Sequence, residues 1–172
     1  MRLIGIAGWS GAGKTTLLTR VIPQLTGRGL RVSTVKHAHH AFDIDQPGKD
    51  SHTHRSAGAS EVLVSSANRF ALMHELRGEP EWTLPALLAK LSPVDLVLVE
   101  GFKRETHPKL EVFRASVGKP MLHPDDPNIV AIASDGKLAA RVPVVPLDDI
   151  AAVADILIAK ALPLETVRAR SA

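Results

Sequence analysis

Cysteine and tyrosine are absent from this 172-residue chain, and aromatic residues make up only 3% of it. Without cysteine there are no disulfides and no thiolate metal ligands, which is compatible with a reducing cytoplasm. Proteins that bind single-stranded nucleic acid stack bases on aromatic side chains beside a dense basic surface. Because the net charge is only +3 and the basic residues are scattered, we expect no nucleic-acid partner.

Long hydrophobic runs are also missing. No apolar run approaches the roughly 20 residues of a membrane helix, and the N-terminal stretch MRLIGIAG leads into a glycine motif instead of a signal-peptide cleavage site. We therefore expect no membrane insertion, no targeting signal and a cytoplasmic location. The length suits one compact domain over residues 1–172.

Short β-branched apolar runs recur along the chain. They cover residues 3–7, 32–35, 96–99, 129–133 and 142–145. Since these runs lack polar alternation, they predict strands of a parallel sheet that are buried on both faces. Apolar residues at spacings of three and four predict helices between the strands, over residues 15–28, 84–91 and 148–162.

Other segments do not follow this alternation. Residues 61–65 and 70–75 predict a hairpin, and residues 110–113 predict a further short strand. The polar segment 37–58 is too long for a plain turn, so it predicts a functional loop with a short helix near its end.

The segment GWSGAGKT at residues 8–15 matches G-x-x-x-x-G-K-[ST] at every fixed position. Backbone N–H groups of such a loop surround phosphates, and the following helix adds its positive N-terminal end. Lys14 would reach the β- and γ-phosphates and Thr15 would bind Mg²⁺. The predicted nucleotide-binding residues here are Trp9, Ser10, Gly11, Ala12, Gly13, Lys14, Thr15 and Thr16.

The placement of this motif between an apolar run and an amphipathic helix sets the fold class. The sequence predicts an α/β protein with a three-layer P-loop NTPase fold, a mainly parallel sheet and a small antiparallel β extension. Residues 1–172 are accordingly interpreted as a single nucleotide-binding domain. No stacking role is assigned to Trp9, which could simply pack over the loop.

An acidic residue follows another apolar run, in DLVLVEG. Glu100 ends this predicted strand, and open parallel sheets bind ligands at that edge. Its carboxylate could hold Mg²⁺ through water or orient an attacking water, which would make Lys14 and Glu100 the catalytic pair. The alternative is a carboxylate that caps a neighbouring backbone N–H.

The guanine-reading motif N-K-x-D does not occur, but the run VAIASD ends in Asp135. A carboxylate can accept hydrogen bonds from both N1–H and the 2-amino group of guanine, and adenine has no such pair of donors. Asp135 is therefore the candidate base reader. Alternatively, it only starts the turn SDGK.

Several motifs together resemble a known family. The phosphate loop, VKHAHH, DIDQPGKDSHTHRSAGA, DLVLVEGFK, PKLEVFR and IVAIASD are similar to those of molybdopterin-guanine dinucleotide biosynthesis protein B, from residue 3 to about residue 150. The resemblance implies a homodimeric GTP-binding protein that uses Mg²⁺ and hydrolyses GTP weakly. It also implies a partner, the MobA-type guanylyltransferase that joins GMP to molybdopterin.

The resemblance extends to a set of polar residues in the family motifs. These are Lys36, His37, Lys49, Asp50, Ser51, Arg55 and Lys103, of which the cationic members could bind a phosphate of GTP or of molybdopterin. Asp45 is a second candidate for the metal side. The alternative for each of them is a solvated polar loop.

Two rival functions stay open. His37, His39, His40, His52 and His54 crowd residues 37–54 and could bind a transition metal in a metal-delivery GTPase, although such sites usually add cysteine. An ATP-dependent small-molecule kinase would use Asp45 or Asp50 as the base for a substrate hydroxyl. Against the kinase, no arginine-rich lid segment is visible.

Overall fold

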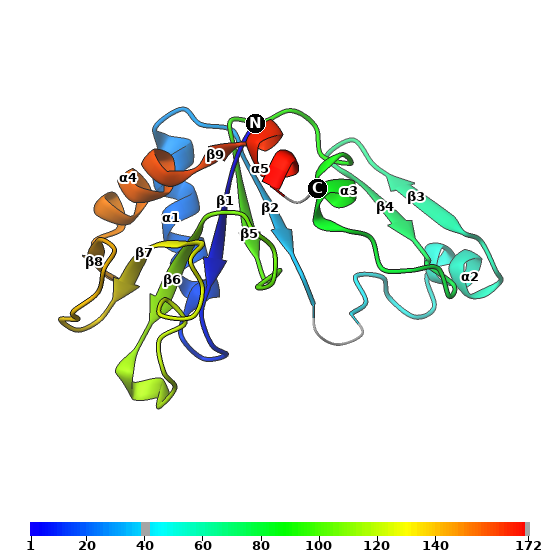
Figure 1. The fold of residues 1–172 in the computed structure, drawn as a ribbon. Coiled ribbons are helices and arrows are strands. Elements are labelled where there is room, and N and C mark those ends of the chain that lie inside the picture. Colours follow the sequence, from blue (N-terminus) through cyan, green and yellow to red (C-terminus); the bar gives the residue numbers. More distant parts are fainter. Residues whose placement is uncertain (39–41, 171–172) are drawn as a thin grey trace. The chain divides into compact units, whose positions relative to one another are not determined.

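The computed structural model describes residues 1–38 and 42–170 (Figure 1). It divides the chain into two compact units. The first unit consists of Met1–His37 and Leu84–Ala172, and the second unit is Ala38–Thr83. The interpretation of residues 1–172 as a single nucleotide-binding domain stays a prediction. Within the described ranges, no helix combines the length and the hydrophobicity that a membrane span requires.

A mainly parallel sheet forms the centre of the first unit. Its strands in spatial order are β2 (Val32–Lys36), β5 (Leu96–Glu100), β1 (Arg2–Ala7), β6 (Lys109–Phe113), β7 (Ile129–Ser134) and β8 (Val144–Pro146). Each neighbouring pair in this order is parallel. The carboxyl ends of these strands therefore lie at one edge of the sheet, and the loops that follow them share that edge.

Helices cover both faces of this sheet. On one face, α1 (Lys14–Gly27) and α4 (Ile150–Lys160) pack on a core that includes Ile4 and Ile6 of β1. On the other face, α3 (Leu84–Leu88) and α5 (Leu164–Arg170) pack around Leu3. Because successive side chains of a strand point to opposite faces, β1 contributes to both cores. The predicted three-layer arrangement is confirmed.

The second unit contains a small antiparallel sheet. Its strands are β3 (Glu61–Ser65) and β4 (Phe70–His74), with α2 (Asp50–Ser56) preceding them. Val62 of β3 is buried, and α2 packs on β3. The predicted hairpin and the predicted short helix near the end of the polar segment are both confirmed.

Two runs that predict fully buried strands form the outer strands of the sheet. β2 and β8 lie at the two ends of the strand order, and both consist of half-buried and exposed residues. The prediction of burial on both faces is wrong for them, because an outer strand has a neighbour on one side only. For β1, β5 and β7 the prediction is confirmed, apart from half-buried terminal residues and Val130.

The predicted helix over residues 148–162 is shorter at both ends. Asp149 precedes the first turn of α4, and its carboxylate accepts a hydrogen bond from the Ala152 backbone N–H at 3.0 Å. At the other end, Leu162 pairs with Leu3 in β9 (Leu162–Pro163), a strand antiparallel to β1. Neither β9 nor α5 was expected from the sequence, because two residues and one short helix carry little periodicity.

The connection from β5 to β6 passes over β1, since these strands lie on its two sides. His107 in this connection is fully buried against Gly5 of β1. A Cβ at Gly5 would lie 2.4 Å from His107 Nε2, so only glycine leaves room for the imidazole. Neither ring nitrogen has a hydrogen-bond partner among the described residues, and burial lowers the pKa of His107 to about 4.

We expect the free energy of unfolding to fall by about 3 kcal/mol between pH 6.5 and pH 4 because of His107. The unfolded chain, in which the histidine has its ordinary pKa, binds this proton at a higher pH than the folded chain does. Acid therefore favours the unfolded state, and stability rises with pH across this window. Urea unfolding of the wild type and of His107→Leu at several pH values measures the effect.

His54→Gln, which changes an exposed histidine, serves as the control and should keep the wild-type pH dependence. An equally steep loss of stability in His107→Leu would contradict the assignment to His107.

Candidate functional site

The glycine-rich loop joins β1 to α1 at the carboxyl edge of the sheet. Gly8 has φ of 141°, and a Cβ there would lie 2.6 Å from the Val112 carbonyl oxygen. Gly13, with φ of 96°, immediately precedes the first residue of α1. Gly8 and Gly13 therefore need the backbone freedom of glycine, and Gly8 also has no space for a Cβ. The loop places its amides beside the N-terminus of a 14-residue helix.

Lys14 folds back across this loop. Its Nζ donates to the carbonyl oxygens of Gly8 and Trp9, both at 3.0 Å. Burial lowers the pKa of Lys14, and the negative charge of Glu100 opposes that shift. The ammonium is thus held over the loop and partly shielded from water, which strengthens its attraction for a phosphate.

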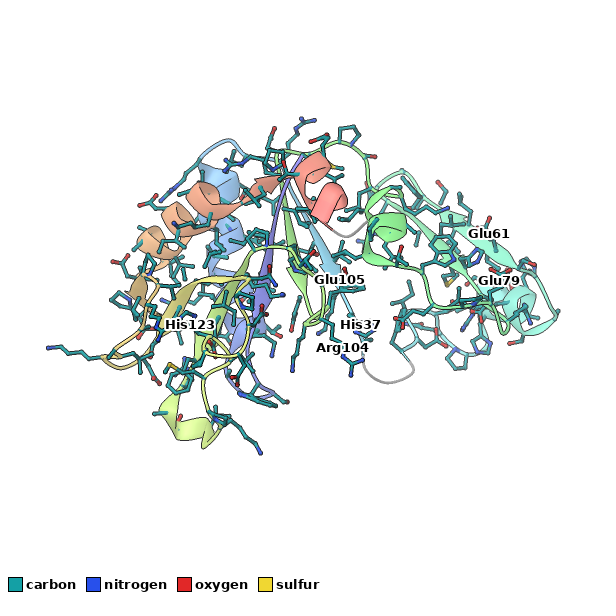
Figure 2. All side chains as sticks on the ribbon, viewed as in Figure 1. His37, Glu61, Glu79, Arg104, Glu105 and His123 are labelled. Atoms are coloured by element: carbon teal, nitrogen blue, oxygen red, sulfur yellow. The ribbon has the colours of Figure 1, made fainter. Side chains whose placement is uncertain are left out.

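Glu100 ends β5, beside β1 in the sheet. Its side chain is only 14% exposed, and one oxygen lies 3.9 Å from Nζ of Lys36 at the end of β2. Next along the chain from Lys36, the backbone N–H of His37 donates to the Glu100 carbonyl oxygen at 2.9 Å. Figure 2 shows His37 just beyond β2. The neighbouring strands β2 and β5 therefore bring Lys36, His37 and Glu100 together, all of which were predicted as site residues.

The chain turns sharply after Glu100. Gly101 and Phe102 both have positive φ, of 94° and 50°. For phenylalanine this conformation is costly, and packing of the Phe102 ring on the core and on His37, with ring centroids 4.9 Å apart, offsets the cost. The turn directs Lys103 to the phosphate loop, where its Nζ lies 5.1 Å from the centroid of the Trp9 ring.

Trp9 is anchored to the protein itself. Its Nε1 donates to the Pro120 carbonyl oxygen at 2.8 Å. The segment that holds Pro120 is fixed in turn by Glu111 of β6, which is fully buried and accepts hydrogen bonds from the backbone N–H groups of Leu122 and His123. Burial raises the pKa of Glu111. Trp9 thus ties the phosphate loop to the Pro120 segment, and its assignment to the nucleotide stays a prediction.

Asp135, the candidate base reader, follows β7. Its carboxylate forms an ion pair with Arg114, from Nη1 to Oδ2 at 3.2 Å. Arg114 follows β6, and its Nε donates to the Ala12 carbonyl oxygen of the phosphate loop, also at 3.2 Å. Arg114 was not predicted as a site residue. Its position directly after a strand, at the ligand-binding edge of the sheet, is a signal that could have identified it.

Among the predicted residues of the second unit, Asp45, Ser51 and Arg55 form a network. Arg55 makes ion pairs with Asp43 at 2.6 Å, Glu75 at 3.1 Å and Asp45 at 3.7 Å. Asp45 also accepts a hydrogen bond from Ser51 at 2.8 Å. The hydrogen bond from Arg55 lowers the pKa of Asp43. Lys49 precedes α2 and is exposed.

This network uses the charge of Arg55 within the second unit. The assignments of Asp45 to a metal and of Lys49 and Arg55 to a phosphate stay predictions. Of the crowded histidines, His39 and His40 lie outside the described residues. Within residues 1–38 and 42–170, no group of three or more histidine, aspartate or glutamate side chains is arranged to hold a metal ion.

The first-unit residues suit a nucleoside triphosphate with Mg²⁺. A hydroxyl at Thr15 and a carboxylate at Glu100 are the hard oxygen ligands that Mg²⁺ prefers, and Mg²⁺ usually keeps several waters besides such ligands. Lys14 and the loop amides supply positive charge for the phosphates. The donors present therefore fit both groups.

The layered parallel sheet and the loop between β1 and α1 define the class of protein: it is an α/β protein with the P-loop NTPase fold. A family model described as molybdopterin guanine dinucleotide synthesis protein B (MobB) matches residues 3–135. Since this match covers more than half of the chain, the chain belongs to the MobB family.

Named relatives agree with this assignment. The molybdopterin-guanine dinucleotide biosynthesis adapter protein of Escherichia coli is 43% identical over 159 residues, which cover 91% of each chain. The Haemophilus influenzae adapter protein is 38% identical over 155 residues, which cover 90% of this chain and 86% of that protein. The resemblance inferred from the motifs is confirmed, and with it the accessory role in molybdenum cofactor biosynthesis.

Solved structures of the family share the fold. A crystal structure of molybdopterin-guanine biosynthesis protein B (MobB) superposes with a TM-score of 0.73 at 28% identity, covering 91% of this chain and 98% of that one. A MobB homolog from Bacillus stearothermophilus gives a TM-score of 0.63 at 28% identity, covering 98% and 99%.

Replacing Lys14 by alanine should weaken binding of Mg²⁺–GTP by about a hundredfold, the loss of two charge-assisted hydrogen bonds to phosphate. Isothermal titration calorimetry measures the affinity. Lys160→Ala removes the same charge from an exposed position at the end of α4 and should bind as the wild type does. Unchanged affinity in Lys14→Ala would show that the loop does not bind phosphate in the way described.

Proposed function

We propose that this protein is a GTP-binding accessory protein with weak Mg²⁺-dependent GTPase activity, which assists attachment of GMP to molybdopterin. The observation that carries the proposal is that Lys14, at the start of α1, Glu100, at the end of β5, and Asp135, just after β7, all lie at one edge of the parallel sheet. Each group suits a different part of one ligand: phosphate, metal and base. We place the protein in the cytoplasm, where GTP is available.

The phosphate loop holds the triphosphate in this proposal. The amides from Trp9 to Thr16 and the Lys14 ammonium neutralise its charge. Thr15 and Glu100 hold Mg²⁺ in the first unit. Support comes from the loop conformation and from the position of Glu100, whose charge acts on Lys14.

Hydrolysis uses the same residues. Lys14 stabilises charge that develops on the γ-phosphate, and Glu100 orients the attacking water. Glu100 lies close to Lys36 at this edge of the sheet, with one carboxylate oxygen 3.9 Å from the Lys36 ammonium. Slow turnover suits a protein whose main task is to bind.

Guanine is read by Asp135. The carboxylate is about one-third exposed and lies beyond the end of β7, so it is open to a base at this edge. Its oxygens accept from N1–H and from the 2-amino group of guanine. Adenine offers no such pair of donors, and the site therefore favours GTP over ATP.

The partners are a MobA-type guanylyltransferase and molybdopterin. The relatives are named adapter proteins of molybdopterin-guanine dinucleotide biosynthesis, and an adapter needs a partner enzyme. Basic residues of the family motifs would contact the molybdopterin phosphate or the partner. In the first unit these are Lys36, His37 and Lys103, and in the second unit, taken by itself, Lys49 and Arg55. Among them, Lys36 is 63% exposed beside Glu100.

A homodimer is also part of the proposal. Leu63 and Leu72 are directly opposite each other on the hairpin, and the next pair on the same face includes Phe70. These side chains are 62%, 48% and 72% exposed. A two-stranded hairpin is marginally stable alone, and a second copy would cover this apolar face.

A nucleotide panel tests the proposed activity. Mg²⁺–GTP should bind more tightly than Mg²⁺–ATP in calorimetry, and hydrolysis should be slow. Asp135→Asn should lower the preference for GTP about tenfold or more, because the amide replaces one acceptor by a donor that faces N1–H. Asp155→Asn changes an aspartate that is also paired with an arginine but lies on α4, and should keep the preference.

Fast phosphate transfer from ATP to a small hydroxyl acceptor would instead support the kinase. A GTP preference that survives in Asp135→Asn would show that another group reads the base.

The double variant Leu63→Ser/Phe70→Ser should sediment as a monomer at concentrations where the wild type is a dimer, because it removes the apolar contact area. Val64→Ser is the matched control, since Val64 is 44% exposed on the opposite face of the hairpin. Analytical ultracentrifugation distinguishes the species. A wild type that is monomeric at micromolar concentrations would overturn the dimer.

A further inference from the structure

Arg114 has no role in the function proposed above, yet it contacts two parts of the site. It follows β6, which lies between β1 and β7 in the sheet. The loop after β1 holds the phosphates and the residue after β7 reads the base, so Arg114 emerges between the two. In the sheet formed by the described residues, β6 is the strand between them.

The first contact is to the phosphate loop. Nε of Arg114 donates to the Ala12 carbonyl oxygen at 3.2 Å. In a planar trans peptide, the C=O of one residue and the N–H of the next point in opposite directions. Arg114 therefore fixes the orientation of the Gly13 N–H, which faces away from the guanidinium. A Gly13 Cβ would lie 3.4 Å from Nε, so the two groups are close together.

The second contact is to the base reader. Nη1 of Arg114 lies 3.2 Å from Oδ2 of Asp135. Both side chains are about one-third exposed, and an ion pair in such a place adds little to stability. Its effect is on conformation: the guanidinium restricts the position of the Asp135 carboxylate.

We propose that Arg114 is a positioning residue that aligns Asp135 with the phosphate loop and so couples guanine recognition to phosphate binding. This inference rests on the proposed GTP site. One rigid guanidinium contacts both the phosphate loop and Asp135. A nucleotide that reaches from Gly13 to Asp135 therefore finds the loop N–H donors and the carboxylate acceptor already aligned. Nucleotides without guanine use only the phosphate half of this arrangement.

The chain contains a matched control for this arginine. Arg28 also contacts one aspartate and one backbone carbonyl: its Nη1 pairs with Asp155 at 2.5 Å and its Nη2 donates to the Ala151 carbonyl oxygen at 3.3 Å. Its side chain is 31% exposed, against 34% for Arg114. Arg28 directly follows α1, at the end opposite the phosphate loop.

The experiment measures dissociation constants for Mg²⁺–GTP and Mg²⁺–ATP by calorimetry. Arg114→Gln should lower the ratio of the ATP constant to the GTP constant about tenfold, a loss equivalent to one charge-assisted hydrogen bond. Arg114→Lys keeps the charge and one donor group and should restore part of the ratio. Arg28→Gln should leave the ratio unchanged. If Arg114 had only a structural role, Arg114→Gln would weaken the binding of GTP and of ATP equally.

A double variant tests whether Arg114 acts through Asp135. In the Asp135→Asn background, Arg114→Gln should cause no further loss of the ratio. A full additional loss there, or a wild-type ratio in Arg114→Gln alone, would overturn the inference. If the wild type shows no preference for GTP, the base-reading part of the proposed function fails. If the preference exists and Asp135→Asn abolishes it while Arg114→Gln does not, only the inference about Arg114 fails.

Discussion

Backbone hydrogen bonds hold β1 in parallel between β5 and β6, with Ile6 paired to Glu100 on one side and to Leu110 on the other. This register brings the phosphate loop and Glu100 to the same level of the sheet. A shift by one residue would exchange the faces of β1, so that each of its side chains would point into the core on the opposite face. The same hydrogen bonds thus stabilise the first unit and align its candidate site.

Groups of opposite charge lie close together at that edge. Glu100 is near Lys36 and its charge acts on Lys14, and Arg114 is paired with Asp135. Partial burial of Lys14 and Glu100 makes the attraction between their charges stronger than it would be in water. A nucleotide with its metal brings both signs of charge, so it can exchange partners with groups that are already in place. Such preorganisation reduces the cost of ordering side chains on binding.

The second unit uses charge differently. Arg55 joins three carboxylates, from the segment before α2 and from the residue after β4. A small unit with a single hairpin has little apolar core, and this network connects its helix to both neighbouring segments. Motifs that are specific to the family therefore include residues that stabilise their own unit. The apolar face of the hairpin is a separate feature, because its exposed side chains contribute nothing to that network.

Local sequence signals predicted the elements with strong periodicity. The phosphate loop, α1 and the central strands β1, β5 and β7 were expected at nearly the observed bounds. Elements without such signals were missed: β9 is defined only by its pairing with Leu3 and Arg2. The outer strands were misjudged because burial depends on how many neighbours a strand has, and the composition of a run does not contain that information.

The sequence by itself determined the phosphate loop and the family, because both are written in contiguous motifs whose spacing has a local physical cause. Only the tertiary structure decided which distant residues meet. Arg114 reaches Ala12 and Asp135, and Trp9 reaches Pro120, across sequence separations without any periodic pattern. These contacts exist because the parallel sheet aligns the ends of separate strands, and that alignment is a property of the folded chain as a whole.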